Sequence, residues 1–518
     1  MNFLDSLRKL DVWIVLFGSA LLSTVIVFSV DLSPLHRAVL YAGLIGIAVF
    51  LTLPNKRILL VVAWVLLHPL SLEKVFIVGK PLLPEFFPPR IVLSGSDLIF
   101  MMLLLYLAFE SFFEREEKVW FVSSPLIPLL FFSFWAILSF YIHRISTDTT
   151  LALLHILKML LFLLVFSSAI RTRNELILVL LSAAIALGIQ ALLVVVSHFS
   201  SVVFHFSSKV SSQLMTFGGT AGQTHVRATG TVGHVNQEAC FLTFFVFPLF
   251  GLLGLKNRWS RLFIVAIITF TFLAIVLTFS RSAWLSSIIG VGIILLMAFK
   301  KRITENRIWL YIFPVIMVGC IFILVFHQSI IDRIVHGDEG ATASRKRAAV
   351  LSLDLFRQHP FLGVGIGNFV GASLEKYPPK VIKNLWLKPG QQPRPLAYRY
   401  GRLEVNQIKI GNRWYIVPLP VHNKYLLVLS ELGIVGLSLF LWFLYCLYRL
   451  AVRCFRTSDS VLLLSAIGFM AGLWAIFCYM NLDLFADDKT VEILLFVPVV
   501  IISLSRIVNN TSLKVTTE

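Results

Sequence analysis

Apolar segments long enough to cross a lipid bilayer recur along most of this chain. About fourteen of them can be counted, each of roughly 15–20 mainly apolar residues. We place them at 12–30, 37–53, 58–72, 97–110, 125–142, 150–170, 175–199, 237–255, 261–279, 283–299, 308–327, 424–447, 460–480 and 491–505. The pattern predicts an all-α polytopic membrane protein with about 12–14 transmembrane helices.

Composition excludes the main alternatives to a membrane protein. Apolar residues make up 58% of the chain and its mean hydropathy is +0.87, which a soluble globular protein does not reach. A net charge of +18 could suggest nucleic-acid binding, but most lysines and arginines stand in short clusters between apolar runs, as orientation signals do. The five cysteines lie in or beside the runs and show neither a disulfide framework nor metal-ligand spacing.

The basic clusters predict which way the chain crosses the membrane. With the N-terminus in the cytoplasm, nearly every cluster falls on the cytoplasmic side, and the run after Arg8-Lys9 is a retained first span rather than a signal peptide. The clusters are Lys56-Arg57, Arg115 with Lys118, Arg171 with Arg173, Lys256 with Arg258 and Arg261, Lys300-Lys301-Arg302, and Arg449 with Arg453 and Arg456. The long loops 200–236 and 328–421 then face outward.

Four regions follow from this topology. Residues 1–199 carry N-terminal transmembrane helices, and 200–327 form core helices with arginine-bearing outer loops. Residues 328–421 form a large extracytoplasmic loop, and 422–518 carry the C-terminal helices.

The large loop contains a predicted amphipathic helix at Ser344–Gln358. Its apolar arc, which includes Leu353 and Leu355, favours a position in the membrane interface. His359-Pro360 ends the helix, and a glycine-rich turn follows at 363–367. That turn lacks the strand and lysine of a phosphate-binding loop, so a nucleotide site is not expected. Residues 376–420 are expected to form an irregular cap.

Two arginines and a histidine are predicted to meet on the outer side. Arg227 lies in the loop segment RATGTVGHVNQEA, Arg281 lies in TFSRSAWL between two spans, and His422 opens a span. Arginine suits phosphate oxygens because its planar fork donates two parallel hydrogen bonds, and histidine suits proton transfer. The plain alternatives are a solvated loop arginine, a snorkelling arginine and an interfacial histidine. Together the three favour an anionic lipid substrate that carries pyrophosphate.

Two further features concern residues inside the spans. A helix beginning near Asn423 would place Gly433 and Gly436 on the His422 face, where small residues let another helix pack closely. Lys158, one turn from His155 within a span, could contact a lipid phosphate or pair with a buried carboxylate.

The His422 segment resembles the histidine motif of bacterial O-antigen ligases. His422-Asn423, nine residues, and Gly433-Ile434-Val435-Gly436 match H-[NSQ]-x9-G-x-x-G. The stretch from Arg281 to Leu285 is similar to the family's R-x3-L element. Arg227 to Asn236 resembles its earlier loop element, and Arg347 to Phe369 resembles the stretch upstream of the histidine.

This resemblance implies an inner-membrane glycosyltransferase of the GT-C type that needs no metal ion and no cofactor. It would move a glycan from undecaprenyl pyrophosphate to an acceptor hydroxyl at the outer leaflet, with the lipid A core as the acceptor of a ligase. His422 would be the base, Arg227 and Arg281 would bind the pyrophosphate, and Lys158, Arg347, Asn423 and Asn236 are further candidates.

Two alternatives stay open. A polymerase of the same superfamily would use another lipid-linked repeat as acceptor, and the histidine motif favours the ligase. A flippase or other transporter for lipid-linked oligosaccharides belongs to a different class. Transporters usually carry polar groups at mid-membrane between repeated halves, whereas the polar groups here gather on one side.

Overall fold

The computed structural model describes residues 55–70, 73–77, 90–113, 119–143, 146–199, 215–218, 224–300, 317, 324, 326–335, 339–376, 408–410, 413–415, 421–482 and 488–517. The chain forms two compact units, Met1–Leu59 and Leu60–Glu518, and the description below concerns the second. The predicted spans 12–30 and 37–53, most of 308–327 and most of the predicted cap at 376–420 lie outside the described residues.

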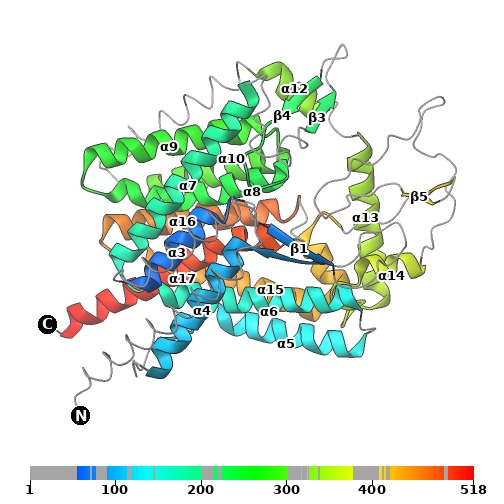
Figure 1. Ribbon diagram of the computed structural model, residues 1–518, viewed down its shortest axis with the longest axis horizontal. Helices are drawn as coiled ribbons and strands as arrows, with labels where there is room; N and C mark the ends of the chain where they lie inside the picture. The colour runs from blue at the N-terminus through cyan, green and yellow to red at the C-terminus, as the bar shows by residue number, and fades with distance from the viewer. Residues whose placement is uncertain are drawn as a thin grey trace, which may run out of the picture. The chain divides into compact units, whose positions relative to one another are not determined.

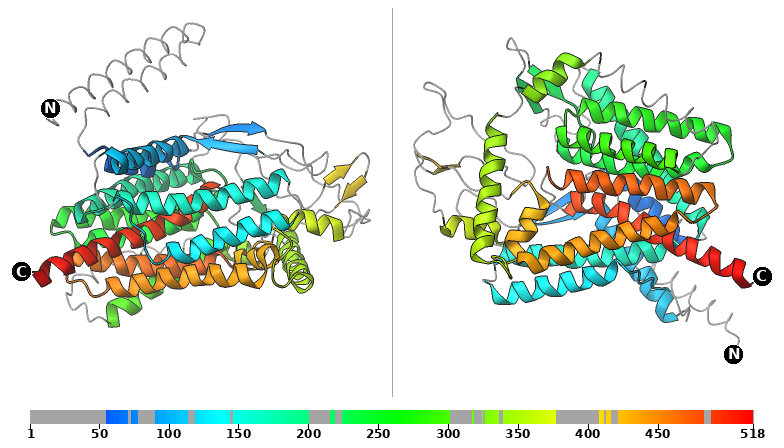
Figure 2. Two further views of the ribbon diagram at one scale, coloured as in Figure 1. Left: turned by 90° about the horizontal axis from the view of Figure 1, so that it is seen from below. Right: turned by 180° about the vertical axis from the view of Figure 1, so that it is seen from behind.

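Apolar helices make up most of the described chain (Figures 1 and 2). The longer ones are α3 (Lys56–Leu67), α4 (Gly95–Phe113), α5 (Leu126–Ile142), α6 (Thr147–Ala169), α7 (Arg173–Phe199), α8 (Val235–Val246), α9 (Arg258–Leu277), α10 (Arg281–Lys300), α15 (Lys424–Cys454), α16 (Ser460–Tyr479) and α17 (Asp488–Thr517). Among the described residues, 8 spans are long and apolar enough to cross a membrane, and α5 and α10 contain shorter apolar helices. The chain is therefore an all-α polytopic membrane protein, as the apolar runs predict.

The remaining elements are short. They are the helices α12 (His327–Val335), α13 (Glu339–Gln358) and α14 (Phe369–Lys376), and the antiparallel hairpins β1–β2 (Glu73–Ile77 with Arg90–Ser94), β3–β4 (Met215–Gly218 with Thr224–Arg227) and β5–β6 (Ile408–Ile410 with Arg413–Tyr415). In Figure 1, α13, α14 and β5 lie at the right and α12, β3 and β4 at the top, whereas the C-terminal end of α17 lies at the left.

The predicted span 237–255 is one continuous segment with two helix types. After α8, the chain continues as the 3₁₀ helix η3 (Phe247–Gly254), which has Pro248 in its first turn. Proline has no N–H to donate and its ring clashes with the carbonyl one turn back, so the α-helical ladder cannot pass through Pro248. The segment is almost completely buried.

Helix α16 lies at the centre of the bundle. It packs against η3, α10, α15 and α17, and most of its side chains are buried, as expected of a helix that is apolar on all sides. At Gly468 the contact with η3 is close, because a Cβ there would lie 2.1 Å from the Phe247 carbonyl oxygen. Small residues thus bring two backbones together in the core.

The turns between helices gather at two opposite ends. At one, here named the Arg171 end, α4 and α6 finish and α7 and α16 begin. Arg171 forms a two-pronged ion pair with Glu110 at 2.8 and 2.6 Å, and Arg173 pairs with Asp459 at 2.8 Å. The Ser460 hydroxyl donates to the Gly254 carbonyl at 3.0 Å. These links therefore share one end of the bundle, as the charge pattern predicts.

The opposite end, here named the His422 end, is where α7, α9 and α16 finish and α8, α10 and α15 begin. Helix α13 packs there on α15. It covers the predicted helix and ends at Gln358 as predicted, with Ala348 and Leu355 buried near Leu427. Leu353, on the predicted apolar arc, is 40% exposed, because α15 covers only part of that arc. The position of α13 in the membrane interface stays a prediction.

Candidate functional site

Arg227 is held against the end of helix α9. It is the last residue of β4, and only 5% of it is exposed. Its Nε donates to the Thr278 carbonyl oxygen at 2.9 Å, and the backbone N–H of Ala228 donates to the Leu277 carbonyl at 3.2 Å. The last carbonyls of a helix lack helical partners and form its negative end, so a guanidinium is favourable there. The same turn leads directly to Arg281, the first residue of α10.

A second hydrogen bond of Arg227 connects it to α8 and, through α8, to α16. Its Nη2 donates to Asn236 Oδ1 at 2.8 Å. The backbone carbonyl of Asn236 in turn accepts from the Tyr479 hydroxyl at 3.1 Å. Tyr479 is buried and is the last residue of α16, so three helix ends meet beside Arg227.

His422 lies where α15 begins, beside the same end of α16. Asn423 caps α15, with its side chain accepting from the Leu426 N–H at 3.0 Å. The N–H of Lys424 donates to the Met480 carbonyl at 2.8 Å, and Asn423 Nδ2 lies 3.4 Å from the Asn481 carbonyl. His422 itself is half-buried.

These contacts form an unbroken path between the predicted residues. The turn before Arg281 contacts Arg227, Arg227 contacts Asn236, and Asn236 contacts the end of α16. Met480 and Asn481, which follow α16, then contact the segment containing His422. The structure thus brings the segments of Arg227, Arg281, Asn236, His422 and Asn423 to one end of the bundle, although they are far apart in sequence.

The histidine motif contains a break in helix α15. Gly433 has φ 68° and ψ −169°, which is not helical, so α15 is two helices joined at a kink. The glycine-rich turn docks there: the Ile434 N–H donates to the Pro360 carbonyl at 2.8 Å, and the Gly365 N–H donates to the Glu431 carbonyl at 3.0 Å. The predicted helix is therefore broken at Gly433, and the prediction that another helix packs against this glycine is wrong. A loop fills that position, because backbone from 360–365 pairs with the carbonyls and N–H groups that the kink releases.

Helix α5 supports the kink from the other side. Trp135 Nε1 donates to the Leu432 carbonyl at 2.9 Å, a group that an unbroken helix would have used internally. The His143 ring lies 2.8 Å from the Ser139 carbonyl and 3.1 Å from the Gly363 carbonyl. Glu431 Oε1 accepts from the Phe369 N–H at 3.3 Å, so this carboxylate faces the glycine-rich turn.

Replacing Gly433 by alanine is expected to destabilise the protein by about 2 kcal/mol or more. Its φ is positive, and a Cβ would lie 2.1 Å from the Phe361 carbonyl oxygen, so both the backbone and the docked loop must shift. The matched control is Gly292→Ala in α10, where a Cβ meets nothing within 4 Å. Thermal unfolding in detergent should separate the two, and an unchanged melting temperature for Gly433→Ala would contradict the structural role of the kink.

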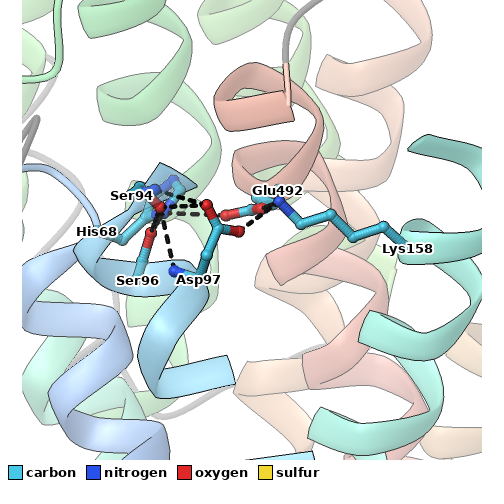
Figure 3. A network of polar contacts seen from close by, with 6 residues as sticks. All are labelled: His68, Ser94, Ser96, Asp97, Lys158 and Glu492. Atoms are coloured by element: carbon cyan, nitrogen blue, oxygen red, sulfur yellow. Dashed lines mark hydrogen bonds and ion pairs between the residues drawn. The ribbon is translucent and has the colours of Figure 1, made fainter. Parts of the chain in front are cut away.

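Lys158 takes part in a network of ion pairs (Figure 3). Its Nζ lies 2.5 Å from Asp97 Oδ1 in α4 and 2.5 Å from Glu492 Oε1 in α17. The other oxygen of Glu492 lies 3.3 Å from His68 Nδ1. The Asp97 carboxylate is oriented by Ser94, whose N–H and hydroxyl donate to Oδ2 at 2.8 and 2.7 Å. Of the two predicted roles, Lys158 therefore takes the pairing with buried carboxylates.

Arg347 lies in α13, and nothing is described of its side chain. Sequence reasoning did not identify Arg333 of α12, which is 5% exposed and donates from Nε to the Phe279 carbonyl at 3.1 Å. It also missed Tyr479 and Glu492. The argument that singled out Arg281, an arginine on the outward side, applies equally to Arg333, which follows the predicted span 308–327. In the described part of the chain, no three or more His, Cys, Asp or Glu side chains are grouped to hold a metal ion.

Comparison with known proteins finds a match, which covers part of the His422 end. Residues 265–441 match a protein-family model described as O-Antigen ligase. The match contains the α9–α10 turn with Arg281, the helix α13, the glycine-rich turn, and the histidine motif with its kink. A search of curated proteins finds no match. The matched region supports a membrane glycosyltransferase activity of the ligase and polymerase type. Through residues 265–441, the chain is thus similar to the O-antigen ligase family.

Proposed function

We propose that this protein is an O-antigen ligase. In this proposal it transfers a glycan from undecaprenyl pyrophosphate to a hydroxyl of the lipid A core, at the outer leaflet of the bacterial inner membrane. The GT-C-type active site lies at the His422 end, which faces the periplasm. The observation that carries the proposal is the contact path from the Arg281 turn through Arg227, Asn236 and Tyr479 to the His422 segment.

In the proposed reaction, His422 accepts the proton of the acceptor hydroxyl as its oxygen attacks the anomeric carbon. The bond between that carbon and the pyrophosphate oxygen breaks, and the electron pair leaves with undecaprenyl pyrophosphate. Arg227 and Arg281 stabilise the charge on the leaving group, which lets two guanidinium groups do the work of a metal ion. Attack from the face opposite the leaving group inverts the anomeric centre.

The three-dimensional contacts of Arg227 support a donor-binding rather than a surface role. A solvated loop arginine would be exposed, whereas Arg227 is buried and oriented by a carbonyl and an amide oxygen. Burial strengthens the interaction of a guanidinium with an anion, because little water competes for it. Asn236 is assigned to orienting Arg227, and Asn423 to placing His422 by capping α15.

The test is a transfer assay with the purified full chain in proteoliposomes. The donor is a glycan on undecaprenyl pyrophosphate, and two acceptors are offered separately: lipid A core, and a second lipid-linked repeat. We expect glycosylated lipid A core, formed equally well with EDTA present and with inverted anomeric configuration by NMR.

Each other outcome rejects a defined part of the proposal. Elongated lipid-linked glycan without modified lipid A core would identify a polymerase. Movement of the donor across the bilayer without any transfer would identify a transporter. Loss of transfer with EDTA that Mg²⁺ restores would reject the role given to the two arginines.

A further inference from the structure

The turn between α9 and α10 contains a residue in a strained conformation. Phe279 has φ 50°, in the left-handed region that a bulky side chain rarely adopts. It lies two residues before Arg281, and its N–H donates to the Val276 carbonyl at 3.0 Å. Such a conformation is energetically unfavourable and persists only where neighbouring groups hold it. The direction in which α10 starts, and hence the place of Arg281, depends on this turn.

Two buried arginines hold the turn by its backbone. Arg227 donates from Nε to the carbonyl of Thr278 at 2.9 Å, and Arg333 donates from Nε to the carbonyl of Phe279 at 3.1 Å. The two arginines come from different segments of the chain, β4 and α12, and are each 5% exposed. Two successive carbonyls of this strained turn thus accept hydrogen bonds from charged donors, and such bonds are stronger than neutral ones.

Arg333 also ties the turn to the large loop 328–421. It belongs to α12, the first helix of that loop, and is preceded by Asp332, which is fully buried. Beside it, the Phe279 ring lies 6.2 Å from the His198 ring at the end of α7 and 6.0 Å from the Trp284 ring in α10. The backbone and the ring of Phe279 are therefore both fixed, and the fixed backbone leads straight into Arg281.

We propose that Arg333 is a positioning residue for donor binding. It holds the Phe279 carbonyl, and through the α9–α10 turn it sets the place of Arg281 for the pyrophosphate of the lipid-linked donor. This inference rests on the donor-binding role proposed for Arg281. It extends that role to the large loop, because Arg333, near the start of the loop, fixes the turn that positions Arg281.

The test measures donor and acceptor separately in the full-length protein. Arg333→Gln should weaken binding of undecaprenyl pyrophosphate and lower kcat/KM for the donor by about 10- to 100-fold, since a misplaced binding group costs that much. The KM for the acceptor should not change. Arg333→Lys keeps a charged donor near the Phe279 carbonyl and should retain part of the lost affinity. Arg357→Gln, which replaces an exposed arginine on α13, is the matched control and should behave as the unaltered chain does.

A double variant asks whether Arg333 acts through Arg281. In a protein that already carries Arg281→Ala, adding Arg333→Gln should cause little further loss of undecaprenyl pyrophosphate binding, because interactions that share one partner are not additive. Full additivity would overturn the inference. So would Arg333→Gln that only lowers the melting temperature and the active fraction, with donor binding unchanged.

Failure of this inference differs from failure of the proposed function. If Arg281→Ala binds undecaprenyl pyrophosphate as tightly as the unaltered chain, the donor site assigned to Arg281 is wrong. If Arg281→Ala binds weakly but Arg333→Gln binds normally, only the role of Arg333 is rejected.

Discussion

Replacing His422 by alanine is expected to abolish glycan transfer while leaving the protein folded and able to bind its donor. A general base contributes about 10²–10⁴-fold to a rate, so the remaining activity should be at most about one per cent. Folding should survive because α15 is capped by Asn423 and anchored by the Lys424 N–H on Met480, neither of which involves the imidazole. The transfer assay in proteoliposomes measures the rate, and binding of undecaprenyl pyrophosphate measures the donor site.

The control for His422 is His359→Ala. His359 is an exposed histidine that follows α13, and its substitution should leave transfer unchanged. Arg281→Ala should weaken both donor binding and transfer, whereas His422→Ala should weaken transfer alone. A His422→Ala protein that transfers glycan at the unaltered rate would remove His422 from the reaction. One that has lost donor binding would move His422 from base to binding residue.

Replacing Lys158 by methionine is expected to destabilise the protein by about 3–5 kcal/mol. The substitution removes the cation from between the carboxylates of Asp97 and Glu492, each 2.5 Å away. Asp97 of α4 and Glu492 of α17 are both buried (Figure 3). Without Lys158, their negative charges would be left unpaired in a medium of low polarity. The melting temperature in detergent and the yield of monodisperse protein report the effect.

Two comparisons make the Lys158 prediction specific. Neutralising both partners as well, in Lys158→Met with Asp97→Asn and Glu492→Gln, should recover much of the stability, because no buried charge then lacks a counter-charge. Arg173→Met breaks the pair with Asp459, whose side chains are 40% and 33% exposed, and should cost at most about 1 kcal/mol. Equal losses for Lys158→Met and Arg173→Met would show that the network is not a buried one.

Much of the candidate site followed from sequence because its residues begin or end helices. A charged residue at the boundary of an apolar run stands out from its surroundings, and Arg281 and His422 both lie at such boundaries. The charge pattern predicts that the links with Arg171 and Arg173 lie on one side of the membrane. Their ion pairs with Glu110 and Asp459 lie together at one end of the bundle. The helix 344–358 was found by its periodicity and its end at proline.

The kink at Gly433 shows where pattern reasoning stops. A run of apolar residues with two glycines fits a straight helix, and local propensity gives no reason to break it. The break depends on the docked segment 360–365, whose backbone pairs with α15 across about seventy residues of sequence separation, and on Trp135 of α5. The ion pairs of Lys158 are similar, since either role suited the sequence and only the approach of α4 and α17 selected one.

Sequence alone thus determined that the chain is a helical membrane protein, which residues stand at its helix ends, and which motif surrounds His422. Those properties depend on the hydrophobicity and order of neighbouring residues, which decide which segments insert into the bilayer. Tertiary structure decided which helix ends meet, that Arg227 and Arg333 grip one strained turn, and that a loop rather than a helix fills the kink. Such contacts join residues distant in sequence, so they arise only when the packed helices bring buried polar groups within hydrogen-bonding distance of one another.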